Sequence, residues 1–264
     1  TKTYDKAVFP VASYTASYDG FVLDETQSVL GGTLSFTGAA ISAVEAGQYD
    51  ITPQGLTSGN YDLVFSNGTL TIEKRALHLS NFNASGKPYD GSTSVTGTWF
   101  DDDRIPGDKL FFVYIAAFED KNAGSSKNVS FEGISIFYGA QMSDYYIAND
   151  SGTAVADITP KALTLGSAHA SDKVYDGTVD AAITATLSGV IGDDDVAFDG
   201  NGAFQDKNVG VGKPVTADGS LSGADASNYT VDPPSGLTAS ITPRPLGVTG
   251  MTVALARRMG FNEH

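Results

Sequence analysis

The chain has 264 residues, with 31 acidic and 16 basic side chains and a formal net charge of −15. Such a charge argues against binding to nucleic acid or to an anionic lipid surface, because both need clustered Lys and Arg. Cysteine is absent, which excludes disulfides, thiolate metal sites and cysteine nucleophiles. The sequence contains no apolar run long enough to span a bilayer, so no membrane insertion is expected. Its first residues do not read as a signal peptide, and we expect a fragment of a longer protein.

Two motifs recur along the chain. Lys-x-Tyr-Asp-Gly occurs at 87–91 and 173–177, and Phe-x-Asp-Lys-Asn-x-Gly occurs at 118–124 and 204–210. Both pairs are offset by 86 residues. A repeat of that length is a whole domain, so the sequence predicts three tandem modules. We place them at 1–74, 75–160 and 161–246.

The first module is the most divergent. It opens on Lys2-Thr-Tyr4-Asp5-Lys6, with Lys where the other copies have Gly, and it has no Asp-Lys-Asn segment. Leu70-Thr-Ile72 alternates with a period of two, which predicts a half-buried final strand.

The second and third modules read as β-strands almost throughout. Segments rich in β-branched and aromatic residues predict strands, and these segments are Leu110–Ile115, Val129–Phe131, Ile134–Tyr138, Ala182–Leu187 and Leu237–Ile241. Short strands separated by frequent turns predict an all-β fold, with immunoglobulin-like Greek-key sandwiches as the module. A β-grasp-like module is the alternative, because strand count alone does not separate the two.

Pairs of Asp or Asn with Gly punctuate the strands and predict tight hairpins with positive φ at the glycine. These glycines are Gly20, Gly68, Gly91, Gly177 and Gly200. Basic or proline-bearing joints near Lys74, Pro160 and Pro243 separate the modules, and no Gly/Ser-rich linker does. The sequence therefore predicts a semi-rigid, elongated array. Residues 247–264 form a tail that either begins a further repeat or is an unrelated appended segment.

Each module has, before its last strand, a tyrosine preceded by Asn or Asp. Asn228-Tyr229 has Asn60-Tyr61 and Asp144-Tyr145 as cognates. In immunoglobulin-like sandwiches, a tyrosine at the corresponding corner bonds through its hydroxyl to upstream backbone. We predict that role here.

These motifs resemble the YDG-type repeat of large bacterial surface and secreted adhesins, most completely at 161–246. The first module is more similar to the related MBG type. The resemblance implies repeats from the stalk of a filamentous-haemagglutinin-like adhesin. It implies no known ligand for these modules.

The repeat motifs are interpreted as structural, with a packed aromatic ring followed by an Asp-Gly turn and with positive φ at Gly124 and Gly210. The residues concerned are Tyr4, Tyr89, Asp90, Gly91, Tyr175, Asp176, Gly177, Phe118, Gly124, Phe204, Gly210, Tyr61, Tyr145 and Tyr229. Glu119 in one copy is Gln205 in the other, and an amide is no general acid or base. No catalytic residue is predicted.

Two acidic runs, Asp101-Asp102-Asp103 and Asp193-Asp194-Asp195, raise the alternative of calcium binding. Their spacing lacks the rhythm of known calcium loops, so solvated turns are favoured. Gly107-Asp108 aligns best with Gly192-Asp193. No other cofactor is predicted.

Two further alternatives concern individual side chains. Lys173 and Asn228 could form an internal cross-link, which an intact mass would detect. Module 2 is rich in aromatic residues, and a surplus on one face would indicate a ligand site. These residues are Trp99, Phe100, Phe111, Phe112, Tyr114, Tyr138, Tyr145 and Tyr146.

The sequence therefore predicts stalk or spacer repeats of a bacterial adhesin that is secreted or held at the cell surface, serving adhesion and biofilm formation. The expected partners are neighbouring repeats of the same parent chain. The alternative is a carbohydrate- or matrix-binding module with its contacts in module 2. We expect a monomer and no enzyme.

Overall fold

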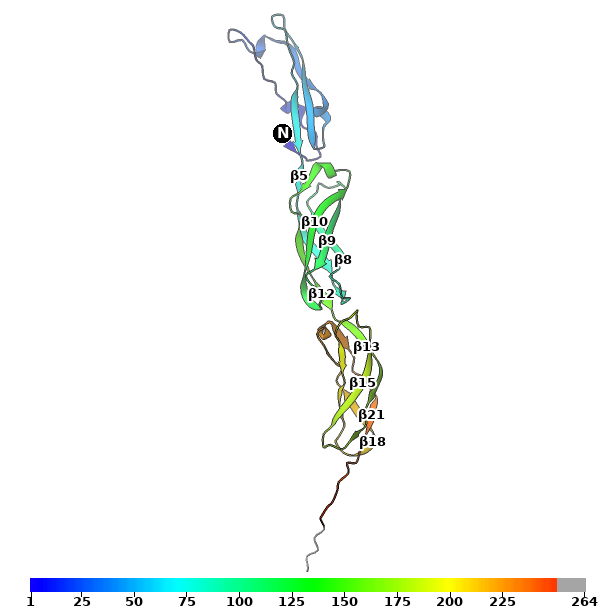
Figure 1. Cartoon of the computed structure of the whole chain (residues 1–264). Coiled ribbons are helices and arrows are strands. Elements are labelled where there is room, and N and C mark those ends of the chain that lie inside the picture. Colours follow the sequence, from blue (N-terminus) through cyan, green and yellow to red (C-terminus); the bar gives the residue numbers. More distant parts are fainter. Residues whose placement is uncertain (251–264) are drawn as a thin grey trace, which may run out of the picture. The chain divides into compact units, whose positions relative to one another are not determined.

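The computed structural model describes residues 1–250 and divides into two units, Thr1–Thr159 and Pro160–His264 (Figure 1). Its regular structure is β-strand apart from short 3-10 turns, so the predicted all-β fold is confirmed. A β-grasp module needs a helix packed across its sheet, and the described residues include no α-helix. None of their helical segments could cross a membrane. Residues 251–264 of the predicted tail lie outside the described residues.

Module 1 contributes one four-stranded sheet to the first unit, in the order β1-β4-β3-β2. Strand β1 runs parallel to β4, and the other neighbours are antiparallel. Its elements are β1 (Lys2–Thr3), η1 (Val11–Ser13), η2 (Gln27–Val29), β2 (Gly31–Thr37), η3 (Ala39–Ser42), β3 (Gly47–Thr57) and β4 (Gly68–Glu73).

Module 2 completes the first unit with a sheet in the order β7-β12-β10-β9 and two strand pairs, β6-β8 and β5-β11. Strands β5 and β7 pair in parallel with β11 and β12. Its elements are β5 (Arg75–Leu77), β6 (Leu79–Ser85), β7 (Lys87–Pro88), β8 (Thr96–Asp102), β9 (Phe111–Phe118), β10 (Gly124–Tyr138), η4 (Met142–Asp144), β11 (Tyr145–Ile147) and β12 (Gly152–Thr159).

The second unit repeats this plan, with strands in the order β14-β21-β18-β17-β15-β13-β20 and a separate pair, β16-β19. Strands β13 and β14 pair in parallel with β20 and β21. Its elements are β13 (Lys161–Ala170), β14 (Lys173–Val174), β15 (Asp180–Ser188), β16 (Ala197–Asp199), β17 (Asn201–Phe204), β18 (Gly210–Ala217), β19 (Ser220–Ser222), η5 (Ala226–Asn228), β20 (Tyr229–Val231) and β21 (Leu237–Thr242).

Apolar residues that alternate along the strands build separate cores. In the second unit, Ile183, Phe204, Val215 and Ile241 from four strands pack together. In module 2 the core is largely aromatic, with ring centroids 5.1–5.7 Å apart at Phe82, Phe100, Phe112, Tyr114 and Phe131. Offset and edge-on aromatic pairs at such distances add to the stability that burial provides. Of the eight aromatic residues named from the sequence, Phe100, Phe112 and Tyr114 lie in this core and Tyr145 is buried. The other four, Trp99, Phe111, Tyr138 and Tyr146, are more than half exposed.

The glycine turns follow the prediction only in part. Gly20, Gly91 and Gly177 have φ of +96°, +77° and +87°, whereas Gly68 and Gly200 do not have positive φ. A Cβ on Gly200 would lie 1.8 Å from the carbonyl oxygen of Ile183. Glycine at that position therefore allows two backbones to approach and is not required by a left-handed turn.

Candidate functional site: lysine clasps and a module joint

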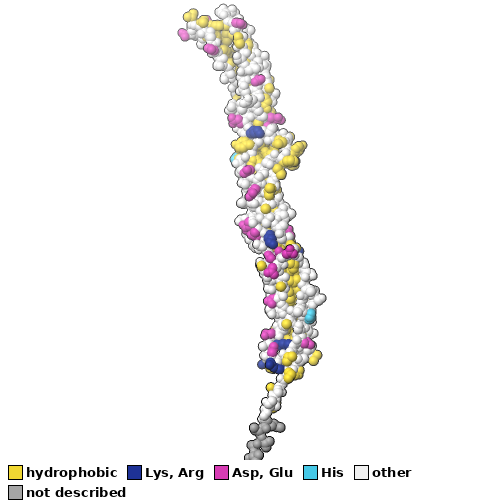
Figure 2. All heavy atoms as spheres, in the orientation of Figure 1, with side chains coloured by type: hydrophobic (Ala, Val, Ile, Leu, Met, Phe, Trp, Pro, Cys, Tyr) yellow, Lys and Arg dark blue, Asp and Glu magenta, His cyan; other side chains and the backbone are white. Residues whose placement is uncertain are grey.

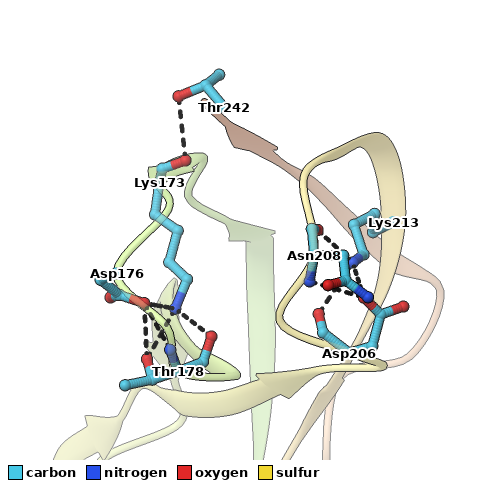
Figure 3. Close-up of polar contacts among 7 residues, drawn as sticks. All are labelled: Lys173, Asp176, Thr178, Asp206, Asn208, Lys213 and Thr242. Atoms are coloured by element: carbon cyan, nitrogen blue, oxygen red, sulfur yellow. Dashed lines mark hydrogen bonds and ion pairs between the residues drawn. The ribbon is translucent and has the colours of Figure 1, made fainter. Parts of the chain in front are cut away.

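The lysine of each Lys-x-Tyr-Asp motif folds over its own loop. Lys173 Nζ lies 3.0 Å from Asp176 Oδ1 and donates to the carbonyl and hydroxyl oxygens of Thr178 at 3.0 and 2.9 Å (Figure 3). Lys87 makes the same contacts with Asp90, at 2.7 Å, and with Ser92. We call these arrangements the lysine clasps. They hold in place the loop that follows the motif strand, next to the parallel strand pair of each module.

Module 1 keeps the clasp although its sequence diverges. Lys2 Nζ lies 2.5 Å from Asp5 Oδ1 and also donates to the carbonyl oxygen of Ala7. The side chains of Lys2, Lys87 and Lys173 are only 11, 11 and 17 % exposed. The methylene stem of each lysine is thus packed, while its ammonium donates hydrogen bonds to oxygen atoms of the loop. This is the usual behaviour of a long amphipathic side chain.

The Phe-x-Asp-Lys-Asn-x-Gly motif builds a second clasp. Lys213 Nζ contacts Asp206 Oδ1 and the carbonyl oxygen of Asn208, both at 2.6 Å (Figure 3). In module 2, Lys127 Nζ lies 2.7 Å from Asp120 Oδ2. The ring of Phe204 lies beneath the ammonium of Lys173 at 5.6 Å. The two motifs therefore meet as one structural feature, and no sequence pattern indicated that Lys127 and Lys213 belong to it.

The prediction of positive φ at Gly124 and Gly210 is wrong, because neither glycine has it. A Cβ on Gly210 would lie 3.0 Å from Lys213 Cδ. Glycine leaves room for the lysine stem to reach its carboxylate, and backbone strain is not the reason for it.

The clasps lower carboxylate pKa values and so make stability depend on acid pH. The hydrogen bond from Lys87 lowers the pKa of Asp90 from 3.8 to about 2. For Asp176, the backbone amide of Thr178 and then Lys173 lower the pKa to about 2. A lowered folded-state pKa contributes stability above 3.8 that is lost as pH falls toward 2.

We therefore expect urea midpoints to fall between pH 4 and pH 2. Lys87→Met keeps the packed stem but removes the charge, so it should flatten this dependence and cost at most about 1 kcal/mol at pH 7. The fluorescence of Trp99, the single tryptophan, reports module 2. An unchanged pH profile in the variant would contradict the role of the clasp.

A tyrosine hydroxyl accepts an upstream backbone amide in every module. Tyr145 Oη accepts from Ile105 N and Tyr229 Oη from Ile191 N, both at 2.9 Å, and Tyr61 Oη accepts from Val22 N at 3.3 Å. This is the bond that the tyrosine corner predicts. Each hydroxyl also donates to a carboxylate, and these partners are Asp108, Asp194 and Glu25.

These bonds correct the alignment of the acidic residues. Asp108 and Asp194 both accept from the corner tyrosine, and their amides donate to the carbonyls of Ile105 and Ile191. Asp194, and not Asp193, is therefore the counterpart of Asp108. Sequence matching missed it because a Pro in one loop is a Gly in the other.

Asp108 also joins module 1 to module 2. Its carboxylate is fully buried and accepts from Tyr145 at 2.7 Å and from Tyr4 at 3.1 Å, while Lys6 Nζ lies 2.8 Å away. The rings of Tyr4 and Tyr145 meet edge to face at 5.4 Å. We call this group the Asp108 joint. Tyr4 and Lys6 of module 1 and Tyr145 of module 2 thus bind one carboxylate. Such charged contacts are directional, so they fix how the two modules meet.

Lys6 explains why module 1 lacks the motif glycine. It occupies the position of Gly91 and Gly177 and, like them, has positive φ, at 62°. That conformation costs a residue with a Cβ about 1–2 kcal/mol. The cost is offset by the ion pair with Asp108, so the substitution places a cation on the joint.

The pKa shifts at the joint follow from burial and from these bonds. Burial alone would raise the pKa of Asp108, but the hydrogen bonds from Lys6, Tyr145 and Tyr4 outweigh it and lower the pKa. Burial and the bond to Asp108 raise the pKa of Tyr145 to about 12. At neutral pH the joint therefore holds a carboxylate and two neutral phenols.

Asp144 is a second buried carboxylate at the same joint. Its side chain accepts from Ala46 N at 2.7 Å, and burial raises its pKa. In the second unit the corresponding residue is the buried Asn228. A raised folded-state pKa favours folding below the ordinary value of 3.8 and opposes it as pH rises.

Asp144→Asn should therefore raise the free energy of unfolding at pH 7 by about 1–2 kcal/mol, because an amide still accepts from Ala46 and carries no buried charge. The gain should shrink on acidification, as Asp144 becomes protonated. Urea unfolding followed through Trp99 at pH 7 and pH 4 tests both points. Equal or lower stability at pH 7 would refute the assignment.

The carboxylates of the two acidic runs accept hydrogen bonds from different kinds of partner. Asp101, Asp102 and Asp103 accept from Asn81, Arg104 and His78, each within the loop or the neighbouring strand. In the other run, Asp193 lies in a turn, Asp194 binds Tyr229 and Asp195 accepts from Ala224 N. Within residues 1–250, no three His, Cys, Asp or Glu side chains gather as a metal ion would need.

Lys173 and Asn228 are not brought together. Lys173 pairs with Ile241 at one end of the sheet, and its amine is held by the clasp. Asn228 precedes Tyr229, which pairs with Lys161. An intact mass equal to that of the unmodified sequence is expected.

The geometry defines a tandem array of all-β modules that share a lysine clasp and a tyrosine corner. Residues 73–154 and 159–236 match the YDG domain family, and residues 1–71 match the MBG domain of the YGX type. The chain belongs to the YDG domain family, with an MBG domain as its first module.

Other comparisons add little. No curated protein matches the chain. Among solved structures, the I9–I11 tandem from titin is similar at 13 % identity over 78 % of this chain and 77 % of that chain, with a TM-score of 0.21.

Proposed function

We propose that the chain forms load-bearing stalk repeats of a bacterial adhesin, secreted or displayed at the cell surface, which serve adhesion and biofilm formation. The modules act by spacing and by resisting extension, without catalysis and without a cofactor. Membership of the YDG and MBG families supports a role for the chain as a repeat array. The high negative charge suits a crowded extracellular surface, since like charges keep such proteins soluble and apart.

The observation that carries the proposal is the parallel pairing of the motif strand with the last strand in every module. β1 pairs with β4, β7 with β12, and β14 with β21. A pull along the chain loads these parallel pairs in opposite directions along their length. In module 2 and the second unit it enters through the first strands, β5 and β13, which are likewise paired in parallel, with β11 and β20. All their hydrogen bonds then bear the load together, and none can open one at a time.

The lysine clasps support the same function. Each clasp anchors the loop that follows the motif strand, at the point where that strand would begin to slide. The Asp108 joint carries load from module 1 into module 2 through side chains as well as through the main chain.

A display assay tests the spacing role. The chain is placed between a cell-surface anchor and a binding head, and capture of beads is counted. Deleting residues 75–160 should reduce capture, and an unrelated β-domain of equal length should restore it. If only the original module restores capture, spacing is not its function.

A second candidate function is binding to a glycan or matrix component through module 2. Alternate residues of the edge strand β9 face solvent, with Phe111, Val113 and Ile115 exposed by 56, 50 and 73 %. Tyr138 lies beside Phe111, with ring centroids 5.9 Å apart. An exposed apolar stripe of this kind is a common feature of interaction surfaces.

A glycan array with the whole chain discriminates between the two candidates. Binding that is lost in Phe111→Ser and retained in the control Val211→Ser would favour the second. Both positions are exposed, so neither change should disturb the fold. Absence of binding leaves the spacer role as the better account.

A further inference from the structure

Strand β9 of module 2 has an open edge. Among the described strands it pairs with β10 and stands last in the sheet order β7-β12-β10-β9. Its other edge meets the chain at its end, where Ala117 forms a bridge with Ser94 and Phe118 N donates to Thr93 O at 2.9 Å. From Phe111 to Ala116, that edge carries no strand in the part of the chain that the structure describes.

The second unit shows how the same edge is closed when glycine is present. There β17 pairs with β15, and the carbonyl of Gly200 accepts from Ile183 N at 2.7 Å. A Cβ on Gly200 would lie 1.8 Å from the carbonyl oxygen of Ile183, so only glycine allows this approach. The residue 86 positions earlier is Tyr114. Its side chain leaves no room for β8 to approach β9 in the same way, and the edge stays open.

The open edge lacks the features that keep edge strands from pairing with other chains. Natural proteins protect such edges with charged residues, proline or bulges. From residue 111 to residue 118, β9 contains no charged residue and no proline. The extra residues at both irregularities of the β9–β10 pairing lie on β10. β9 itself is therefore a continuous strand that another strand can join.

The side chains beside the open edge are apolar. Phe111, Val113 and Ile115 alternate along β9 and are 56, 50 and 73 % exposed. Figure 2 shows hydrophobic side chains gathered at the surface of module 2. The chain as a whole has a net charge of −15, so two copies repel one another over most of their surface. This uncharged strand is a place where copies can meet without bringing carboxylates together.

We propose that β9 of a second copy of this chain pairs antiparallel with β9, so that two copies join through a two-fold axis at Val113. Phe111 then lies opposite Ile115 of the second copy, and the two Val113 side chains face one another. Each exposed apolar side chain meets another apolar side chain, which stabilises antiparallel pairs. The same patch serves on both copies, as a closed dimer requires. The proposal departs from the monomer expected from the sequence.

The register follows from the limits of the open edge. A shift by one residue would place exposed side chains of one copy beside inward-facing side chains of the other. A two-fold axis at Tyr114 would bring Phe111 of the second copy against Ala117, where Ser94 already pairs. An axis at Phe112 would place Lys109 of the second copy opposite Ile115, on the apolar stripe. The axis at Val113 avoids all three conflicts.

Sedimentation of the whole chain tests whether copies associate. One strand pair is a small interface, so we expect a dissociation constant on the order of 100 µM. The weight-average mass should rise from near that of one chain at about 10 µM to almost twice that value at about 1 mM, and no further.

A charged variant tests which edge is used. Val113→Lys should abolish the rise in mass, because two ammonium groups would face one another at the axis. Val155→Lys is the matched control and should keep the rise, since Val155 is 60 % exposed in β12, within the same sheet but away from its open edge. Urea unfolding read through Trp99 shows that both variants remain folded.

Three outcomes of sedimentation would overturn the proposal. The first is an association that survives Val113→Lys, and the second is a mass that grows beyond two chains. The third is a wild-type chain that stays monomeric, which would leave the apolar stripe to a different partner, such as the glycan of the second candidate function.

Single cysteines test the register, because the chain has no cysteine of its own. Opposite Cα atoms of an antiparallel pair lie about 4.5–5.5 Å apart, within the reach of a disulfide. Val113→Cys should therefore form a disulfide-linked dimer under mild oxidation. In Ile115→Cys, the two cysteines would lie four residues apart along the paired strands, about 13 Å, and should not cross-link. No cross-link at Val113, or equal cross-linking at both positions, would contradict the inference and leave the spacer function untouched.

Discussion

Replacing Asp108 with alanine should lower the free energy of unfolding of module 2 by about 3–5 kcal/mol, the cost of removing one partner of a buried charged pair. The change leaves two buried tyrosine hydroxyls without their acceptor and the Lys6 ammonium without its counter-charge. Urea unfolding followed by Trp99 fluorescence measures the loss.

Glu132→Ala is the matched control, since Glu132 is an exposed carboxylate in the same module. We expect it to change stability by less than about 0.5 kcal/mol. A loss for Asp108→Ala as small as that of the control would mean that the Asp108 joint is not a stabilising contact.

Tyr145→Phe should cost module 2 about 2–3 kcal/mol, because the variant removes one hydrogen bond to a carboxylate and leaves the amide of Ile105 unpaired. The ring and its contact with Tyr4 remain, so packing does not account for the loss. The same urea unfolding measures it.

Two comparisons sharpen this prediction. Tyr146→Phe alters the neighbouring tyrosine, which is 52 % exposed, and should be nearly neutral. In the variant with both Tyr145→Phe and Asp108→Ala, the two losses should not add, because the side chains share one hydrogen bond. Full additivity would contradict the network.

Strands and corners could be predicted from the sequence because their signals are local. Alternation of apolar residues predicts β4 and β21, and the Asn-Tyr or Asp-Tyr motif predicts the hydroxyl bond to upstream backbone that Tyr145 and Tyr229 make. These features depend on residues close in sequence or on a repeated pattern.

The joint and the open edge of β9 could not be predicted in the same way, because each depends on how distant segments pack. Nothing in the sequence around Asp108 indicates that its carboxylate contacts Tyr4, which is 104 residues away. Lys6 did give a signal, namely a lysine at a glycine position, but its reason is visible only across the joint. The prediction of positive φ at Gly124 and Gly210 is wrong. A Cβ on Gly210 would crowd the stem of Lys213 at 3.0 Å, whereas a Cβ on Gly124 would be in ordinary contact with Lys127 at 3.5 Å.

Stretching single chains from both ends tests the load-bearing modules most directly. Independent cores in series should unfold in separate events, and each complete module should release about 300 Å of chain at about 3.5 Å per residue. Lys173→Met should lower the force of one event only. A single event that releases the whole chain, or gradual extension without force peaks, would contradict the account.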